Sequence, residues 1–128
     1  MTRVLVVDDD PDMVRIVTFR LRERGHRVIG AGSGTEALEI MQTKGAPDVV
    51  VADVSMPDMD GLELARRLRQ TEALQSIPVI FLSARVTPED IQAGHSLGAL
   101  YLTKPFVASA LLAKIDEATR TQVAESAW

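Results

Sequence analysis

The chain alternates between short apolar runs and longer segments in which apolar residues recur every three or four positions. Continuous apolar runs are typical of buried strands, and a spacing of three and four is typical of helices with one buried face. The runs predict strands at Arg3–Val7, Arg27–Ala31, Asp48–Ala52, Pro78–Leu82 and Leu100–Leu102. The third and fourth runs do not alternate with polar residues, so we expect these two strands in the centre of a sheet that is covered on both faces.

Helices are expected between the strands. The predicted buried stripes are Met13, Ile16, Val17 and Leu21 in the first helix, Ala37, Leu38 and Met41 in the second, Leu62, Ala65 and Leu68 in the third, and Leu111, Leu112 and Ile115 in the last. Gly25 and Gly45 stand where the first two helices should end. Thr87 followed by Pro88 predicts the start of the fourth helix, and the last helix is expected from about Val107 to Thr119.

Strands that alternate with helices indicate repeated βαβ units and a parallel sheet. Short connections and right-handed crossovers leave few ways to wind such a chain. We expect an α/β fold of the flavodoxin-like kind, a doubly wound (βα)₅ sheet with strand order 2-1-3-4-5. That order places the carboxyl ends of the first and third strands side by side, at the point where ligands bind in such sheets.

Length and composition limit the remaining possibilities. The 128 residues fit one domain, expected over residues 1–119, with residues 120–128 as a polar tail or the start of a linker. Zero cysteines exclude disulfides, thiolate catalysis and cysteine zinc sites. A net charge of −4 argues against direct nucleic-acid binding, and no apolar run approaches the roughly 18 residues of a membrane span. We therefore expect a cytoplasmic protein that binds neither nucleic acid nor membrane.

Acidic residues follow two of the predicted strands. Asp8, Asp9 and Asp10 end the first strand, and Asp53 directly follows the third. The expected winding brings these carboxylates together, where like charges either raise a pKa or recruit a cation. Oxygen ligands without a nearby histidine or cysteine favour Mg²⁺. The alternative is an acidic loop that is simply solvated.

Two further polar residues are expected at the same edge of the sheet. Ser83 follows the fourth strand and Lys104 follows the fifth. A hydroxyl and an ammonium beside a metal-bound carboxylate suit phosphoryl transfer, because that reaction depends on positioning and on neutralising charge. Taken alone, a serine here is usually a turn former and a lysine usually faces solvent.

Four spaced motifs carry a resemblance to a known family. They are Val6-Val7-Asp8-Asp9-Asp10, Asp53-Val54-Ser55-Met56-Pro57-Asp58-Met59-Asp60-Gly61, Leu82-Ser83-Ala84 and Tyr101-Leu102-Thr103-Lys104-Pro105-Phe106. Together they span nearly the whole chain and resemble the receiver domains of response regulators in bacterial two-component systems.

The resemblance implies a role for each matching residue. Asp53 is expected to be the phosphoacceptor, which attacks the phosphohistidine of a histidine kinase or phosphotransfer protein to form an acyl phosphate. Asp8, Asp9 and Asp53 are expected to bind Mg²⁺ with the backbone carbonyl of Ser55, and Lys104 to pair with the phosphoryl oxygens. The domain would catalyse only its own phosphorylation and dephosphorylation, and would not be an enzyme acting on a separate substrate.

Ser83 and Tyr101 match the switch pair of the family, in which the hydroxyl is drawn to the phosphoryl group and the ring moves inward behind it. The responding surface is expected on the fourth helix, fifth strand and fifth helix, where it would control a downstream protein, a missing output domain or a phosphorylation-dependent homodimer. The alternative interpretation of Tyr101 is a half-buried strand aromatic. The run Gly98-Ala99-Leu100-Tyr101 is one residue shorter than is usual in the family, and lacks its acidic residues.

The resemblance also sets expectations for neighbouring positions. Asp10 is expected at the surface or as a helix cap, and the bond between Lys104 and Pro105 is expected to be cis. Ser55 and Arg85 stand two residues beyond the phosphoacceptor and the switch hydroxyl, the positions that tune phosphoryl lifetime in the family.

Two other classes of function are alternatives, an enzyme and a binding module. A phosphatase similar to the haloacid dehalogenases also uses an aspartate nucleophile at a strand end, but it would need an acid two residues later, where this chain has Ser55. A phosphorylation-independent interaction module would keep the fold alone. A flavin site is disfavoured, because acids follow the first strand where a phosphate-binding loop would be needed.

Overall fold

The computed structural model describes residues 2–83, 87–104 and 106–119. The elements in chain order are β1 (Arg3–Val7), α1 (Pro11–Glu23), β2 (Arg27–Ala31), α2 (Gly34–Lys44), β3 (Val49–Asp53), α3 (Gly61–Gln70), β4 (Val79–Ser83), α4 (Pro88–Ser96), β5 (Leu100–Thr103) and α5 (Ala108–Thr119). All strand pairs are parallel, in the order β2-β1-β3-β4-β5. The predicted fold class is therefore confirmed, with β3 and β4 inside the sheet.

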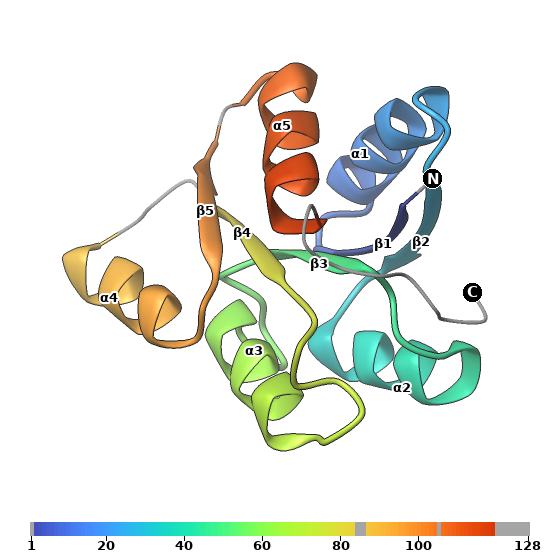
Figure 1. Ribbon diagram of the computed structural model, residues 1–128. Helices are drawn as coiled ribbons and strands as arrows, with labels where there is room; N and C mark the ends of the chain where they lie inside the picture. Colours follow the sequence, from blue (N-terminus) through green and yellow to red (C-terminus); the bar gives the residue numbers. More distant parts are fainter. Residues whose placement is uncertain (1, 84–86, 105, 120–128) are drawn as a thin grey trace.

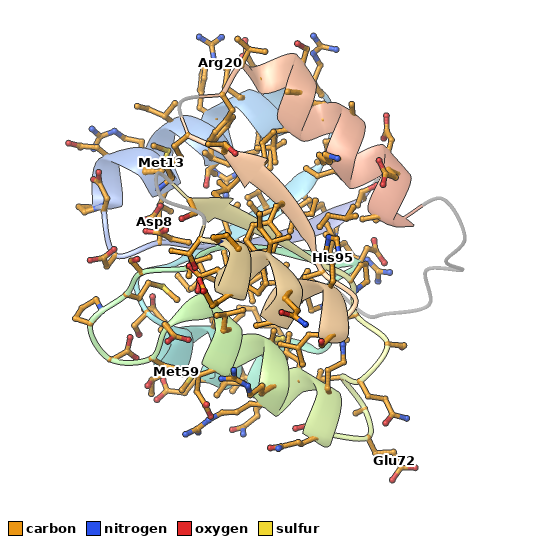
Figure 2. All side chains as sticks on the ribbon, turned by 90° about the vertical axis from the view of Figure 1, so that its left-hand side faces the viewer. Asp8, Met13, Arg20, Met59, Glu72 and His95 are labelled. Carbon is orange, nitrogen blue, oxygen red and sulfur yellow. The ribbon has the colours of Figure 1, made fainter. Side chains whose placement is uncertain are left out.

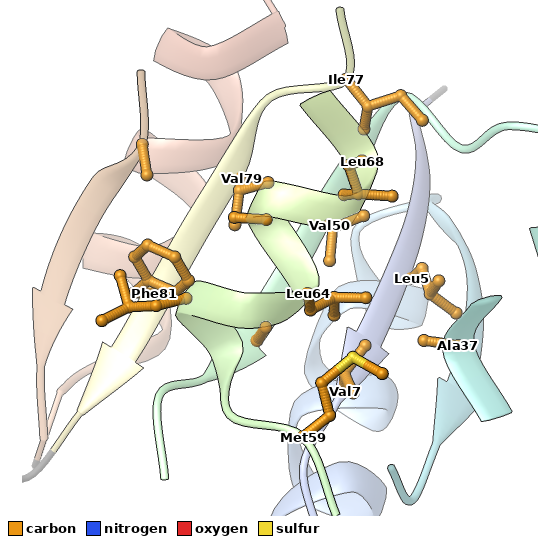
Figure 3. Packing of buried hydrophobic residues seen from close by; sticks show 14 of the residues in the cluster. Leu5, Val7, Ala37, Val50, Met59, Leu64, Leu68, Ile77, Val79 and Phe81 are labelled. Carbon is orange, nitrogen blue, oxygen red and sulfur yellow. The ribbon is translucent and has the colours of Figure 1, made fainter. Parts of the chain in front are cut away.

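Helices cover both faces of the sheet (Figure 1). Helices α1 and α5 lie on one face, and α2, α3 and α4 lie on the other. Side chains of the sheet alternate between two apolar clusters, with Val4 and Val6 in the first and Leu5 and Val7 in the second. Figure 3 shows the second cluster, in which α3 packs across strand residues such as Val50. The three inner strands, β1, β3 and β4, are buried because helices lie on both sides of them.

The strand boundaries differ slightly from the prediction. Strands β3 and β4 begin and end one residue later than expected, so that Asp53 and Ser83 are the last residues of their strands. The parallel register extends to these positions, pairing Asp53 with Leu82 and Ser83 with Thr103. The strand framework thus fixes the backbone of both residues.

The buried stripe of α1 is narrower than predicted. Val17 and Leu21 are buried and Met13 packs against them, but the side chain of Ile16 is 55% exposed. Residues 13, 17 and 21 repeat at a spacing of four, which keeps one line of the helix against the sheet. Ile16 lies beyond that line, so the prediction that it is buried was wrong.

Side-chain caps set the helix starts. Asp10, Ser33, Asp60 and Thr87 each cap the helix that follows and accept a hydrogen bond from a backbone N–H of its first turn. The predicted start of α4 at Pro88 is confirmed, and the start of α5 is one residue later than expected. Gly25 and Gly45 follow the first two helices, as predicted. No helix among the described residues is both long and apolar enough to cross a membrane.

A buried ion pair lies at the amino ends of the strands, opposite to the acidic carboxyl ends. The Arg3 guanidinium donates to Asp48 through Nη2 at 2.6 Å and through Nε at 3.0 Å, and the Arg3 backbone N–H adds a bond at 2.8 Å. Burial alone would raise the pKa of the Asp48 carboxyl, but the bonds from Arg3 outweigh burial and lower it. The pair therefore ties β1 to the start of β3 as long as Asp48 is ionised.

We expect Asp48→Asn to lower the free energy of unfolding at pH 7 by about 3 kcal/mol, because it removes the carboxylate charge that faces the buried Arg3 guanidinium. Urea denaturation of both proteins measures the difference. Glu23→Gln, which breaks the exposed pair with Arg20, is the control and should cost less than about 1 kcal/mol. Equal losses in the two variants would contradict this assignment.

Candidate functional site

The acidic strand ends meet at the carboxyl edge of the sheet. Strands β1 and β3 are neighbours, and oxygen atoms of Asp8, Asp9 and Asp53 all lie within 4.8 Å of one another. Asp8 is only 2% exposed, Asp53 is half-buried and Asp9 is exposed. Figure 2 shows Asp8 on the side of the molecule opposite to Glu72, which follows α3. The structure therefore forms the carboxylate cluster that the sequence predicts.

Lys104 joins this cluster from the end of β5. Its Nζ atom lies 3.2 Å from Asp8 Oδ2 and 3.7 Å from Asp53 Oδ2. The backbone N–H of Lys104 donates to the Ser83 carbonyl at 2.8 Å, which continues the pairing of β4 and β5 by one residue. Sheet pairing thus carries the ammonium to carboxylates that lie far away in sequence.

The cluster carries more negative than positive charge. Burial raises the pKa of Asp53, the Lys104 ammonium opposes that rise, and the charges of Asp8 and Asp9 add to it. Three carboxylates face one ammonium, so ionised Asp53 lies in an unfavourable environment. A bound divalent cation or a second positive group would relieve the repulsion.

Asp8 is oriented by the chain that follows it. The backbone N–H of Asp10 donates to Asp8 Oδ1 at 3.0 Å. The Asp10 carboxylate accepts from the Asp12 N–H at 3.0 Å and caps α1. Asp10 is therefore a helix cap, as expected, and the start of α1 fixes the direction of the Asp8 carboxylate.

The connection from β3 to α3 returns close to its own start. The Gly61 N–H donates to the Val54 carbonyl at 2.8 Å. A Cβ atom on Gly61 would lie 2.5 Å from the Asp53 carbonyl oxygen, so only glycine allows the first turn of α3 to approach the end of β3 this closely. Ser55 lies exposed within this connection, and its N–H donates to Asp53 Oδ1 at 3.4 Å.

A second contact fixes the same connection to α2. Asp58 Oδ2 accepts from Thr35 Oγ1 at 2.8 Å and from the Thr35 N–H at 3.2 Å. The bond from the Thr35 hydroxyl is the main reason that the pKa of Asp58 is lowered. Nothing in the sequence indicated this contact, because its partners are 23 residues apart and neither forms a local motif.

Ser83 and Tyr101 lie in neighbouring strands, at the end of β4 and within β5. Ser83 ends β4 with 3% of its surface exposed. Tyr101 is half-buried, its ring centroid lies 5.2 Å from that of Phe81, and its hydroxyl donates to the Asp90 carbonyl of α4. The ring is already packed against α4, and Tyr101 also fits the description of a half-buried strand aromatic.

The expectations for Arg85, for the Lys104–Pro105 bond and for residues 120–128 lie outside the described residues.

We expect Asp53→Asn to increase the free energy of unfolding at pH 7 in the presence of EDTA. The raised pKa of Asp53 means that its charge destabilises the fold above that pKa, and the substitution removes the charge. At about pH 3 the carboxyl is protonated in both the folded and the unfolded state, so the gain should disappear. Urea denaturation at both pH values tests this.

Asp12→Asn is the control for this experiment, because Asp12 lies outside the carboxylate cluster. It should show no comparable gain at pH 7. A loss of stability in Asp53→Asn at pH 7 would instead show that attraction to Lys104 outweighs burial and repulsion.

Comparisons with known proteins agree with this geometry. Residues 4–116 match the response regulator receiver domain family. The structure is similar to the chemotaxis protein CheY4 of Vibrio cholerae, with 34% identity and a TM-score of 0.86 over 92% of this chain and 98% of that one. It is also similar to the receiver domain of the Francisella response regulator 1452, with 35% identity and a TM-score of 0.85 over 95% of this chain and 100% of that one.

Similar sequences occur in longer regulators. The chain is 39% identical over 125 residues to the transcriptional regulatory protein KdpE of Mycobacterium tuberculosis, covering 97% of this chain and 54% of that protein. It is 39% identical over 105 residues to the alkaline phosphatase synthesis transcriptional regulatory protein PhoP of Bacillus subtilis, covering 81% and 42%. The chain thus spans about half the length of these curated relatives. With its fold, its acidic strand ends and the match over residues 4–116, the chain belongs to the response regulator receiver domain family.

Proposed function

We propose that this chain is a phosphorylation-dependent switch of a two-component system. Asp53 accepts a phosphoryl group from a histidine kinase or phosphotransfer protein, in a reaction that depends on Mg²⁺. The observation that supports this most is the convergence of Asp53, its two acidic neighbours and Lys104 at one edge of the sheet. The proposal includes a cytoplasmic location, where such a donor and a downstream protein would meet the domain.

The residues of the cluster fit a Mg²⁺ site. Oxygen atoms of Asp8, Asp9 and Asp53 lie close enough to share one ion, and no sulfur or imidazole ligand belongs to this group. The backbone carbonyl of Ser55 would complete the protein ligands. When bound, Mg²⁺ supplies neutralisation of the charge on the phosphoryl oxygens.

The chemistry itself is carried by Asp53. One carboxylate oxygen forms a bond to phosphorus while the bond between phosphorus and the donor imidazole nitrogen breaks, and the imidazole keeps that electron pair. Lys104 then exchanges its contact with Asp53 for contacts with the phosphoryl oxygens. The close approach of Lys104 Nζ to both Asp8 and Asp53 supports this role, because the ammonium already lies beside the acceptor.

Phosphorylation adds negative charge and strong hydrogen-bond acceptors at the end of β3. Ser83 ends the neighbouring strand, so its hydroxyl is the group that we propose responds first. The response would reach the surface formed by α4, β5 and α5, through which the domain controls a downstream protein, an output domain or a second copy. Since KdpE and PhoP are described as transcriptional regulatory proteins, an output domain that regulates transcription is one form of this proposal.

Incubation with acetyl phosphate and Mg²⁺ should add one phosphoryl group, detected by intact mass. Asp53→Asn should show no adduct, because it lacks the nucleophile, and EDTA should suppress labelling of the unchanged protein. Lys104→Met should be labelled more slowly, since it loses the ammonium beside Asp53. An adduct that persists in Asp53→Asn would place the acceptor elsewhere.

Titration with Mg²⁺ tests the metal site without phosphorylation. Asp9→Asn should weaken Mg²⁺ binding by at least about tenfold, because the lost attraction to a divalent ion exceeds about 1.4 kcal/mol at the dielectric of a protein surface. Asp12→Asn, outside the cluster, should bind as the unchanged protein does. Equal affinity in all three proteins would exclude the cluster as the ion site and leave a phosphorylation-independent interaction module as the better interpretation.

A further inference from the structure

Helix α4 contains a glycine in its last turn, two residues before Ser96. Gly94 lies within Pro88–Ser96 and is buried. Glycine is unfavourable inside a helix because it loses more backbone freedom on folding than any other residue. A buried glycine at this position is therefore expected where another group needs the space of its side chain.

The ring of Tyr101 occupies that space. A Cβ atom built on Gly94 would lie 2.8 Å from the Tyr101 hydroxyl oxygen and 2.9 Å from Cζ, closer than non-bonded atoms can approach. The Tyr101 hydroxyl donates to the Asp90 carbonyl, one turn earlier on the same helix. The ring thus contacts α4 at two successive turns, and both contacts require a position without a side chain at Gly94.

The other side of the ring leads back towards the phosphoacceptor. Tyr101 pairs with Phe81 in the register of β4 and β5, and the two rings lie with centroids 5.2 Å apart. Phe81 is fully buried, and its Cε1 atom lies 3.1 Å from the Cβ position of Gly61. Gly61 is the residue whose backbone packs on the Asp53 carbonyl. Phe81 and Gly61 therefore lie between Tyr101 and the end of β3.

We propose that Gly94 is a positioning residue of the switch: its empty side-chain position admits the Tyr101 ring beneath α4 and couples α4 to β5. The inference deepens the proposed function, on which its role in signalling rests, by naming the residue that sets the position of Tyr101. It also means that the ring is packed inward before phosphorylation, so that a signal acts on α4 and β5 as one unit.

A double-mutant cycle in thermal unfolding tests the contact. Alanine is favoured over glycine inside a helix, so Gly94→Ala should raise the unfolding temperature wherever the ring is absent. We expect Gly94→Ala to lower the unfolding temperature of the unchanged protein and to raise it in a Tyr101→Ala background. Gly32→Ala, where a new Cβ atom would meet only Glu36 Oε1 at 3.8 Å, should have the same effect in both backgrounds. An equal rise from Gly94→Ala in both backgrounds would overturn the proposal.

Tyr101 is the single tyrosine of the sequence, so 3-fluorotyrosine labelling gives one ¹⁹F resonance from this ring. In the unphosphorylated protein, Gly94→Ala should move that resonance towards its position in urea, and Gly32→Ala should leave it in place. Intact mass after acetyl phosphate treatment should show equal labelling of Asp53 in all of these proteins. An unchanged resonance in Gly94→Ala would refute the positioning role. Absence of labelling in the unchanged protein would count against the proposed function alone, because the ring position is read without phosphorylation.

Discussion

Repulsion among carboxylates at the end of β1 and β3 is the constraint on which the site depends. Parallel pairing of these two strands brings Asp8 and Asp53 to one edge, where burial and mutual charge oppose ionisation of Asp53. Apolar packing on both faces of the sheet offsets the electrostatic cost of ionised Asp53, because it holds the strands in place whatever the charges at their ends. Because ionised Asp53 already lies in an unfavourable environment, a charge added at this edge would change the stability of the folded state.

The loops and helix starts around the site hold these carboxylates in a defined geometry. Asp10 orients Asp8, Gly61 allows α3 to pack on the end of β3, and Thr35 binds Asp58 from α2. These contacts fix the Asp8 carboxylate, the first turn of α3 and the loop that precedes it. Hydrogen bonds and packing thus fix the surroundings of the carboxylates, whereas Lys104 reaches them through a longer side chain.

Much of this arrangement could be predicted from sequence, for physical reasons. Apolar runs covered on both faces identify parallel strands, and strand ends of a known winding must share an edge, so the grouping of Asp8, Asp53 and Lys104 followed from spacing alone. Exposure of Ile16 could not be predicted, because helical spacing does not show how narrow a stripe the sheet will cover. The contact between Thr35 and Asp58 depends on the packing of α2 beside a loop, which no local pattern encodes.

The two edges of the sheet give the domain opposite responses to acid. At one edge, Asp48 is stabilised as an anion by Arg3, so its pKa is lowered, and acid weakens the fold once the pH is low enough for the unfolded chain to take up a proton at Asp48. At the other edge, protonation of Asp53 begins at a higher pH and removes a repulsion. From these two groups alone, mild acidification should first raise the free energy of unfolding, and stronger acidification should then lower it. The metal-free domain would therefore be most stable at a pH between the two titrations. A cation bound at the acidic edge would remove the first phase and leave the second, so the shape of the acid response itself reports whether the site is filled.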